Sequence, residues 1–230
     1  MIKNLNLATY SPLKYVLPEK QKQYSKKYDI AVKGGQSVFK MADREQSLVH
    51  LMRVNILKRM ESSINSFGIT IANLLNQIDA TLDKIQRKQY EYSADLSITD
   101  IDIDDNGLED LLIGNKVKIL LQDMDLIRWK QDLEDDKKKL EELLYESAKV
   151  VINRDAKLNT LKELLYNKIN NPINKDNKKV IIFSAFADTA NYLYENISEW
   201  ALNKFGVHTA LVTGGGDNKT TLKTIKRKEL

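Results

Sequence analysis

The sequence predicts a mainly α-helical protein with a partial α/β region at its carboxyl end. Apolar residues recur at steps of three and four over residues 43–66 and 69–92, and the same period returns over residues 115–150. Residues 180–183 are instead four consecutive apolar side chains, a run too short for a buried helix and typical of a central strand in a parallel sheet. The low glycine and proline content, 9 and 3 among 230 residues, agrees with long regular elements.

The first 40 residues are predicted to be irregular, with short elements. Pro12, Pro18 and the glycine pair at 34–35 interrupt any regular pattern. Lysines lie between tyrosines from Tyr15 to Tyr28, and basic residues interleaved with aromatic rings can follow a phosphate backbone. A solvated surface helix explains this composition more simply.

Residues 43–66 are predicted to form a helix with one apolar side. Arg53, Lys58 and Arg59 lie off that side, and they would face a nucleic-acid surface, an inter-lobe surface or solvent alone. The apolar side consists of Leu48, Leu51, Met52, Ile56, Met60 and Ile64.

Residues 67–150 are predicted to form a long antiparallel helical hairpin. The apolar positions of its first helix alternate between steps of four and three, as in coiled coils, and residues 135–139 of the second helix would be exposed. The joining loop, residues 95–110, is the most acidic stretch. It begins like a calcium-binding loop, but Ile113 stands where the bidentate glutamate belongs, so a solvated hairpin tip is the better interpretation. The apolar positions are Ile71, Leu75, Ile78, Leu82 and Ile85, then Leu126, Trp129, Leu133, Leu140 and Leu144.

The carboxyl-terminal part is predicted to alternate strands and helices, with parallel strands and a right-handed crossover. The turn after the first strand lies where open α/β sheets bind ligands. The start of the next helix, capped by Asp188 or Thr189, suits a phosphate because its N–H groups lack partners. The predicted elements are a helix at 150–170, a strand at 179–184, a helix at 188–204, a strand at 207–213 and a helix at 218–229.

A second polar segment follows the next predicted strand. Gly214, Gly215 and Gly216 permit a close approach of the backbone to a ligand, and Lys219 and Thr220 add a cation and a hydroxyl. This segment is either a phosphate site or a loop without a ligand. Positive charge nearby would strengthen salt-sensitive binding, and it comes from Lys223, Lys226, Arg227 and Lys228.

Residues 179–189 resemble a known family. Their sequence, Lys-Val-Ile-Ile-Phe-Ser-Ala-Phe-Ala-Asp-Thr, is similar to the strand and helix that open the second motor lobe of superfamily 2 helicases and Swi/Snf-type ATP-dependent DNA translocases. The likeness extends over about residues 150–222, and a weaker one covers residues 10–66. It implies three parts: residues 1–66 as the end of the first motor lobe with linker helices, 67–150 as a coiled-coil-like hairpin insertion, and 151–230 as the amino-terminal half of a truncated RecA-like lobe.

The resemblance also implies a function. Members of this family are ATP-dependent nucleic-acid motors, and the second lobe contacts the DNA backbone without reading its sequence. ATP and Mg²⁺ are implied for the intact motor, whose first RecA-like lobe would be the partner of this chain. By position, the nucleic-acid-binding residues would be Ser184, Phe186, Thr189, Gly214, Gly215, Lys219 and Thr220, beside a basic surface of Arg53, Lys58, Arg59, Lys223, Lys226 and Arg227.

The residues that would make this chain an ATPase by itself are missing. No Gly-x-x-x-x-Gly-Lys-Ser/Thr phosphate loop occurs, and the nearest segment, residues 213–220, has Thr213 and Asn218 at the two glycine positions. The family's second-lobe arginine motifs are missing too. We therefore expect a fragment of a longer motor, without catalytic residues or a cofactor of its own, that does not hydrolyse ATP alone.

Two other functions are compatible with the residues. A non-enzymatic helical adaptor would oligomerise through the hairpin, using Leu75, Ile78 and Leu82, or through an open sheet edge. An independent Rossmann-like domain is disfavoured because the glycine-rich turn follows the second predicted strand and lacks the Gly-x-Gly-x-x-Gly spacing.

The composition limits the remaining classes. The absence of cysteine excludes disulfides and zinc–thiolate sites, and only two histidines argue against a histidine metal site. The net charge of +4 is weak evidence for nucleic acid. Because no stretch approaches 18 apolar residues, the expectation is a soluble cytoplasmic protein without membrane contact.

Overall fold

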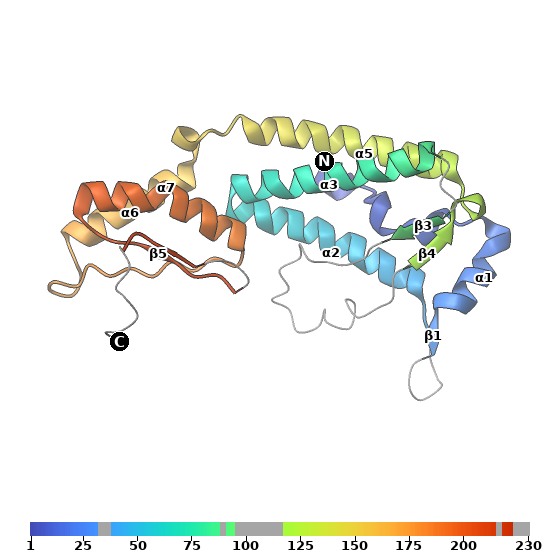
Figure 1. Ribbon diagram of the computed structural model, residues 1–230, viewed down its shortest axis with the longest axis horizontal. Coiled ribbons are helices and arrows are strands. Elements are labelled where there is room, and N and C mark those ends of the chain that lie inside the picture. Colours follow the sequence, from blue (N-terminus) through green and yellow to red (C-terminus); the bar gives the residue numbers. More distant parts are fainter. Residues whose placement is uncertain (32–37, 88–90, 95–116, 215–217, 223–230) are drawn as a thin grey trace. The chain divides into compact units, whose positions relative to one another are not determined.

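The computed structural model describes residues 1–31, 38–87, 91–94, 117–214 and 218–222 (Figure 1). The chain divides into two compact units. Unit 1 comprises Met1–Lys58 and Ile69–Glu146, and unit 2 comprises Arg59–Gly68 and Ser147–Leu230. Helices dominate the described residues, as the sequence predicts, and none of those helices has the length and apolar character needed to span a membrane.

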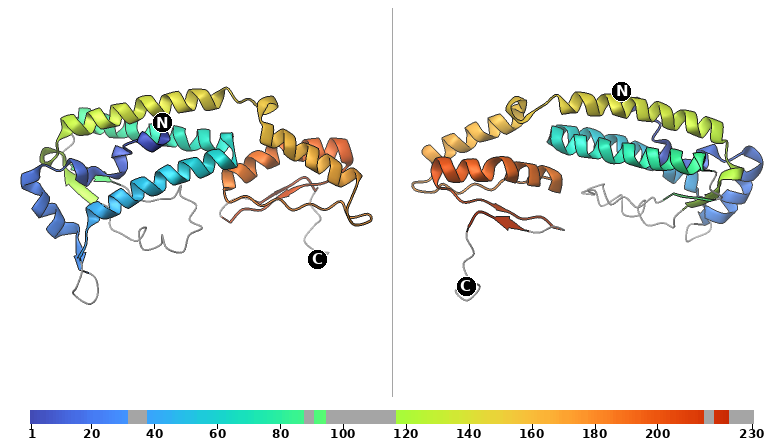
Figure 2. Two further views of the ribbon diagram at one scale, coloured as in Figure 1. Left: turned by 180° about the vertical axis from the view of Figure 1, so that it is seen from behind. Right: turned by 45° about the horizontal axis from the view of Figure 1, so that its top comes forward.

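Unit 1 is built on three long helices. The helices α2 (Met41–Ser62), α3 (Ile64–Gln86) and α5 (Leu126–Ala148) lie side by side (Figures 1 and 2). Both α2 and α5 run antiparallel to α3. The predicted helices at 43–66 and 69–92 are confirmed with shifted ends, except that residues 91–92, expected to be helical, belong to a strand. The regular elements are α1 (Pro18–Tyr28), β1 (Ile30–Ala31), β2 (Val38–Phe39), α2 (Met41–Ser62), α3 (Ile64–Gln86), β3 (Glu91–Ala94), β4 (Val117–Leu120) and α5 (Leu126–Ala148).

Many residues of the predicted apolar sides of these helices belong to the core of unit 1, but Met60 is 41% exposed and lies in unit 2. Leu75 and Ile78, through which an adaptor would self-associate, are buried within the core of unit 1. Fully buried side chains come from all three helices, and Leu5 and Ile119 outside them are buried to the same extent. Those of the helices are Leu48 and Ile56 from α2, Ile71 from α3, and Trp129, Leu133 and Leu140 from α5.

The second helix of the hairpin begins later than predicted. Residues 115–150 were expected to be one helix, but β4 pairs antiparallel with β3 and α5 begins only at Leu126. Tertiary hydrogen bonds explain the difference, because the hydroxyl of Tyr24 accepts from the N–H of Leu120 and that of Tyr28 bonds to the backbone of Lys118. The acidic loop at 95–110 lies outside the described residues.

Unit 2 packs two helices against short extended segments. The helices are α6 (Ala156–Asn170) and α7 (Ala187–Phe205), and Leu158, Leu165 and Ile197 belong to their shared core. Gly206, with φ at 64°, ends α7 in the left-handed conformation that glycine adopts easily. The extended elements are β5 (Ala210–Leu211) and β6 (Lys219–Thr220).

The strand pairing in unit 2 differs from the prediction. β5 pairs antiparallel with β6, which occupies the start of the helix expected at 218–229; residues 223–229 lie outside the described part. Threonine side chains favour the hairpin, since the Thr221 Oγ1 accepts from the N–H of Thr209 at 2.9 Å. Residues 179–184, predicted to be a strand, do not pair with a neighbouring strand among the described residues. The residue that caps α7 is Phe186, so the prediction of Asp188 or Thr189 as the cap is wrong.

Residues 180–183 nevertheless have the alternation of an extended segment. Val180 and Ile182 are 43% and 45% exposed, whereas Ile181 and Phe183 are 78% and 91% exposed. Figures 1 and 2 show this orange segment beside β5, on one side of the α6–α7 pair. The apolar run therefore turns alternate side chains to two faces, and one face is almost fully open.

Asp155 links the start of α6 to α7. Its carboxylate accepts from the N–H of Leu158 at 3.0 Å, which caps α6, and from the hydroxyl of Tyr192 at 2.8 Å. Burial, together with the hydrogen bond to Asp155 and its negative charge, raises the pKa of Tyr192 to about 12.

We expect this bond to make the stability of unit 2 fall at alkaline pH. An unfolded tyrosine has a pKa of about 10, so the folded state favours the protonated hydroxyl; its contribution is complete below pH ~10 and is lost as the pH rises towards about 12. Thermal unfolding followed by circular dichroism should be measured between about pH 9 and pH 12, a range that brackets the two pKa values. The melting temperature of Tyr192→Phe should fall less steeply with pH than that of the unaltered chain. Tyr194→Phe is the control, and an unchanged slope in Tyr192→Phe would contradict the assignment.

Candidate nucleic-acid interface

The first predicted contact region is the turn that leads into α7. Ser184 is exposed, and its Oγ both accepts from the N–H of Phe186 and donates to the Phe186 carbonyl, each at 3.1 Å, which holds the turn in shape. Phe186 and Thr189 are both buried, each 5% exposed. Ser184 and the first N–H groups of α7 are therefore the parts of this turn that could meet a phosphate, while the Phe186 and Thr189 side chains pack inside unit 2.

Residues from the α2–α3 turn cover this corner within unit 2. The Arg59 Nη1 lies 2.8 Å from the Asp188 carboxylate, and the Arg59 guanidinium carbon lies 4.8 Å from the centre of the Phe186 ring. The hydroxyls of Ser62 and Thr189 are 2.9 Å apart, within hydrogen-bond distance. Sequence reasoning did not connect these residues, because 127 and 129 positions separate the partners of the two polar contacts.

The second predicted region is the glycine-rich segment, which joins two antiparallel strands. Gly214 and Lys219 are exposed, whereas Gly215 lies outside the described residues. The Thr220 hydroxyl donates to the Thr209 carbonyl at 3.1 Å. A strand-to-strand hairpin does not present the row of helix N–H groups that a phosphate loop needs, and Thr220 is already engaged. Among the described residues of this segment, Lys219 is an exposed group that could hold an anion.

The predicted basic surface is only partly present on the outside of the chain. Lys58 is exposed, but the Arg53 Nε donates to the Leu5 carbonyl at 3.0 Å and Arg59 is buried on Asp188. Lys223, Lys226 and Arg227 lie outside the described residues. The structure thus leaves Lys58 as the exposed member of this set.

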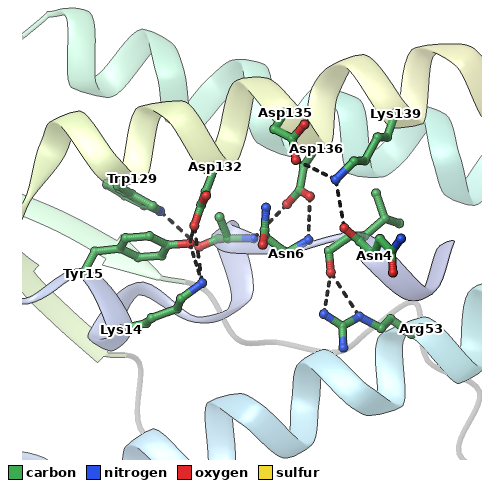
Figure 3. Close-up of polar contacts among 12 residues, drawn as sticks. Asn4, Asn6, Lys14, Tyr15, Arg53, Trp129, Asp132, Asp135, Asp136 and Lys139 are labelled. Atoms are coloured by element: carbon green, nitrogen blue, oxygen red, sulfur yellow. Dashed lines mark hydrogen bonds and ion pairs between the residues drawn. The ribbon is translucent and has the colours of Figure 1, made fainter. Parts of the chain in front are cut away.

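Unit 1 contains a buried polar network that the sequence interpretation missed (Figure 3). Residues 135–139 were expected to be exposed, yet the Asp136 side chain is fully buried. Its carboxylate accepts from the N–H of Asn6 at 2.6 Å and of Ala8 at 3.1 Å. Burial raises the pKa of Asp136, and these N–H donors oppose that shift. The missed signal is spacing, since Asp136 lies three after Leu133 and four before Leu140, on the apolar side of α5.

Tyr15 adds a second anchor for the amino-terminal segment. Its hydroxyl donates to the Asp132 carboxylate at 2.7 Å, and Lys14 pairs with the same carboxylate at 3.3 Å (Figure 3). Burial is the main cause that raises the pKa of Tyr15 well above its ordinary value. The tyrosines and lysines of residues 15–28 thus include groups that hold unit 1 together, rather than an open row for a phosphate backbone.

Comparisons with protein-family models, with curated proteins and with solved structures gave no match. Among the described residues, no group of three or more His, Cys, Asp or Glu side chains is placed to hold a metal ion.

Proposed function

We propose that this chain is part of a superfamily 2 helicase or Swi/Snf-type translocase, and that unit 2 contributes to the second motor lobe that contacts the DNA backbone. One observation carries the proposal: the apolar run at 180–183, which resembles the family's opening strand, alternates in exposure and leads directly into α7. A soluble protein seldom leaves such a run in water, so it is best explained as a strand that other parts of a lobe complete.

The layering of unit 2 supports this explanation. α6 and α7 lie on one side of the extended segments, while Ile181 and Phe183 are open. Parallel sheets are covered by helices on both faces. We propose that the complete lobe is RecA-like, with strands and helices alternating in a parallel βαβα order. In such a lobe residues 180–183 would lie within the sheet, and other elements would cover the face that is open here.

The proposed contacts with DNA are electrostatic and independent of sequence. The N–H groups at the start of α7 can donate to phosphate oxygens, and Lys219 can neutralise one phosphate. The Ser184 hydroxyl would donate to a phosphate in exchange for its bond to the Phe186 carbonyl. Phe186 and Thr189 would support the turn from inside. ATP and Mg²⁺ would be bound chiefly by the first lobe, because the sequence of this chain has no Gly-x-x-x-x-Gly-Lys-Ser/Thr phosphate loop.

We expect the chain to bind duplex DNA weakly, with a dissociation constant of about 10⁻⁴–10⁻⁶ M at physiological salt, as for other non-specific contacts. Fluorescence anisotropy over a salt series checks this. Lys219→Ala should weaken binding and reduce the slope of log affinity against log salt by about 1. Ser184→Ala should weaken binding without changing the slope, because a neutral donor releases no counterion.

Lys157→Ala and Thr160→Ala are matched controls, since both residues are exposed on α6 away from the proposed contacts in the sequence. Equal losses in the test and control variants would contradict the assigned contacts. Self-association without DNA binding would favour the helical adaptor instead. If this chain alone hydrolysed ATP in a DNA-stimulated manner, the proposal that the first lobe supplies the ATP site would be contradicted.

A further inference from the structure

Arg59 is a charged side chain held inside unit 2. It is 5% exposed, and its partner Asp188 retains 38% exposure of its side chain. A buried guanidinium is tolerated when its charge and its donors are matched, and removal of one partner is costly. Arg59 is matched by two residues at the start of α7: the Asp188 carboxylate at 2.8 Å and the Phe186 ring at 4.8 Å.

The choice of arginine follows from this geometry. A planar guanidinium can stack on a ring and donate to a carboxylate at its edge at the same time, which a lysine ammonium cannot do. A helix amino terminus by itself disfavours a nearby cation, so the Asp188 carboxylate is needed to hold Arg59 there. The Ser62–Thr189 contact at 2.9 Å attaches the same two segments a second time.

We propose that Arg59 is a positioning residue for the nucleic-acid turn, residues 184–189. Arg59 contacts the ring of Phe186, which is the N-cap of α7, and pairs with Asp188 in the first turn of that helix. These two contacts would fix the direction in which Ser184 and the first N–H groups of α7 point. We expect no direct contact between Arg59 and a phosphate, because this side chain is 5% exposed and pairs with Asp188 at 2.8 Å. The turn is thus shaped by the α2–α3 connection, and this role rests on the proposed function.

Hydrogen exchange of the full chain without DNA tests the grip. The N–H of Ala190 bonds to the Phe186 carbonyl at 3.1 Å and reports on the first turn of α7. We expect Arg59→Ala to speed its exchange at least about tenfold, which corresponds to about 1.4 kcal/mol. Arg59→Lys should give an intermediate increase. Asp188→Asn keeps the shape of the site and should also speed exchange, so the test survives if Arg59→Ala fails to fold.

Arg87→Ala is the matched control, because Arg87 pairs with Asp83 at 2.9 Å on the surface of unit 1, with side chains 69% and 50% exposed. Exposed pairs contribute little, so exchange at Ala190 should not change. Unchanged exchange in both Arg59→Lys and Asp188→Asn would overturn the inference, whatever the chain does with DNA.

DNA affinity distinguishes a positioning role from a purely structural one, because a residue that only stabilises the fold would leave the affinity of the folded chain unchanged. Arg59→Ala should lower affinity about as much as Ser184→Ala, with an unchanged salt slope. A slope reduced by about 1 would mean that Arg59 contacts a phosphate directly, and it would overturn the positioning role. If exchange changes as expected but the unaltered chain binds no DNA, the proposed function fails together with the nucleic-acid role of the turn. Failure of the exchange test alone leaves the proposed function standing.

Discussion

Replacement of Asp136 by alanine is expected to lower the free energy of unfolding by about 3 kcal/mol. The Asp136 carboxylate is fully buried and accepts from the N–H groups of Asn6 and Ala8. Each buried donor left without an acceptor costs about 1–3 kcal/mol. Two such donors, both in the segment that packs on α5, account for the expected loss.

Urea unfolding monitored by circular dichroism measures this effect. Asp136→Asn should lose roughly half as much, because an amide oxygen can still accept from one N–H. Asp135→Ala is the control, since Asp135 lies next in sequence but pairs with Lys139 at the surface, where ion pairs contribute about 0–1 kcal/mol. Equal losses for Asp135→Ala and Asp136→Ala would contradict the buried role.

Trp129→Ala is expected to have the largest effect, a loss of about 3–5 kcal/mol, as for other buried tryptophans. The Trp129 side chain is fully buried, its Nε1 donates to the Ala8 carbonyl at 3.1 Å, and its ring lies 6.1 Å from that of Tyr15. The substitution therefore removes core volume and a hydrogen bond together.

The same urea experiment separates the two contributions. Trp129→Phe keeps most of the ring but removes the donor, so it should cost less than Trp129→Ala. Ile127→Ala is the control, because Ile127 lies on the same helix and is 75% exposed. A stable Trp129→Ala chain, with a loss near the ~0.5 kcal/mol typical of surface positions, would disprove the assigned core.

The two sites meet at one residue of the amino-terminal segment. Ala8 donates its N–H to Asp136 and accepts with its carbonyl from Trp129. If one of these two hydrogen bonds is lost, Ala8 is held less rigidly and the other hydrogen bond becomes weaker. The combined variant Asp136→Ala plus Trp129→Ala should therefore cost less than the sum of the single losses, because neighbouring sites do not add.

Long helices could be predicted from residue order because their signal is local. The apolar period of α2 and α3 is visible in the sequence, and both helices form within a few residues of the predicted ends. The start of α7 after residues 180–183 was likewise foreseen, although the cap was not. Where partners far away in the chain decide the outcome, the prediction failed, as for residues 117–120, whose backbone bonds to Tyr24 and Tyr28. The local hairpin between residues 210–211 and 219–220 was missed as well.

The residue order by itself determined the helical periods, the apolar run at 180–183 and the absence of a phosphate loop, because each is a property of neighbours within a few positions. Tertiary structure alone decided that Asp136 is buried beneath the amino-terminal segment and that Arg59 reaches the start of α7. The physical reason is distance along the chain. A carboxylate or guanidinium has the same formula in water and in a core, and only the groups that folding brings to it decide whether it is solvated or held.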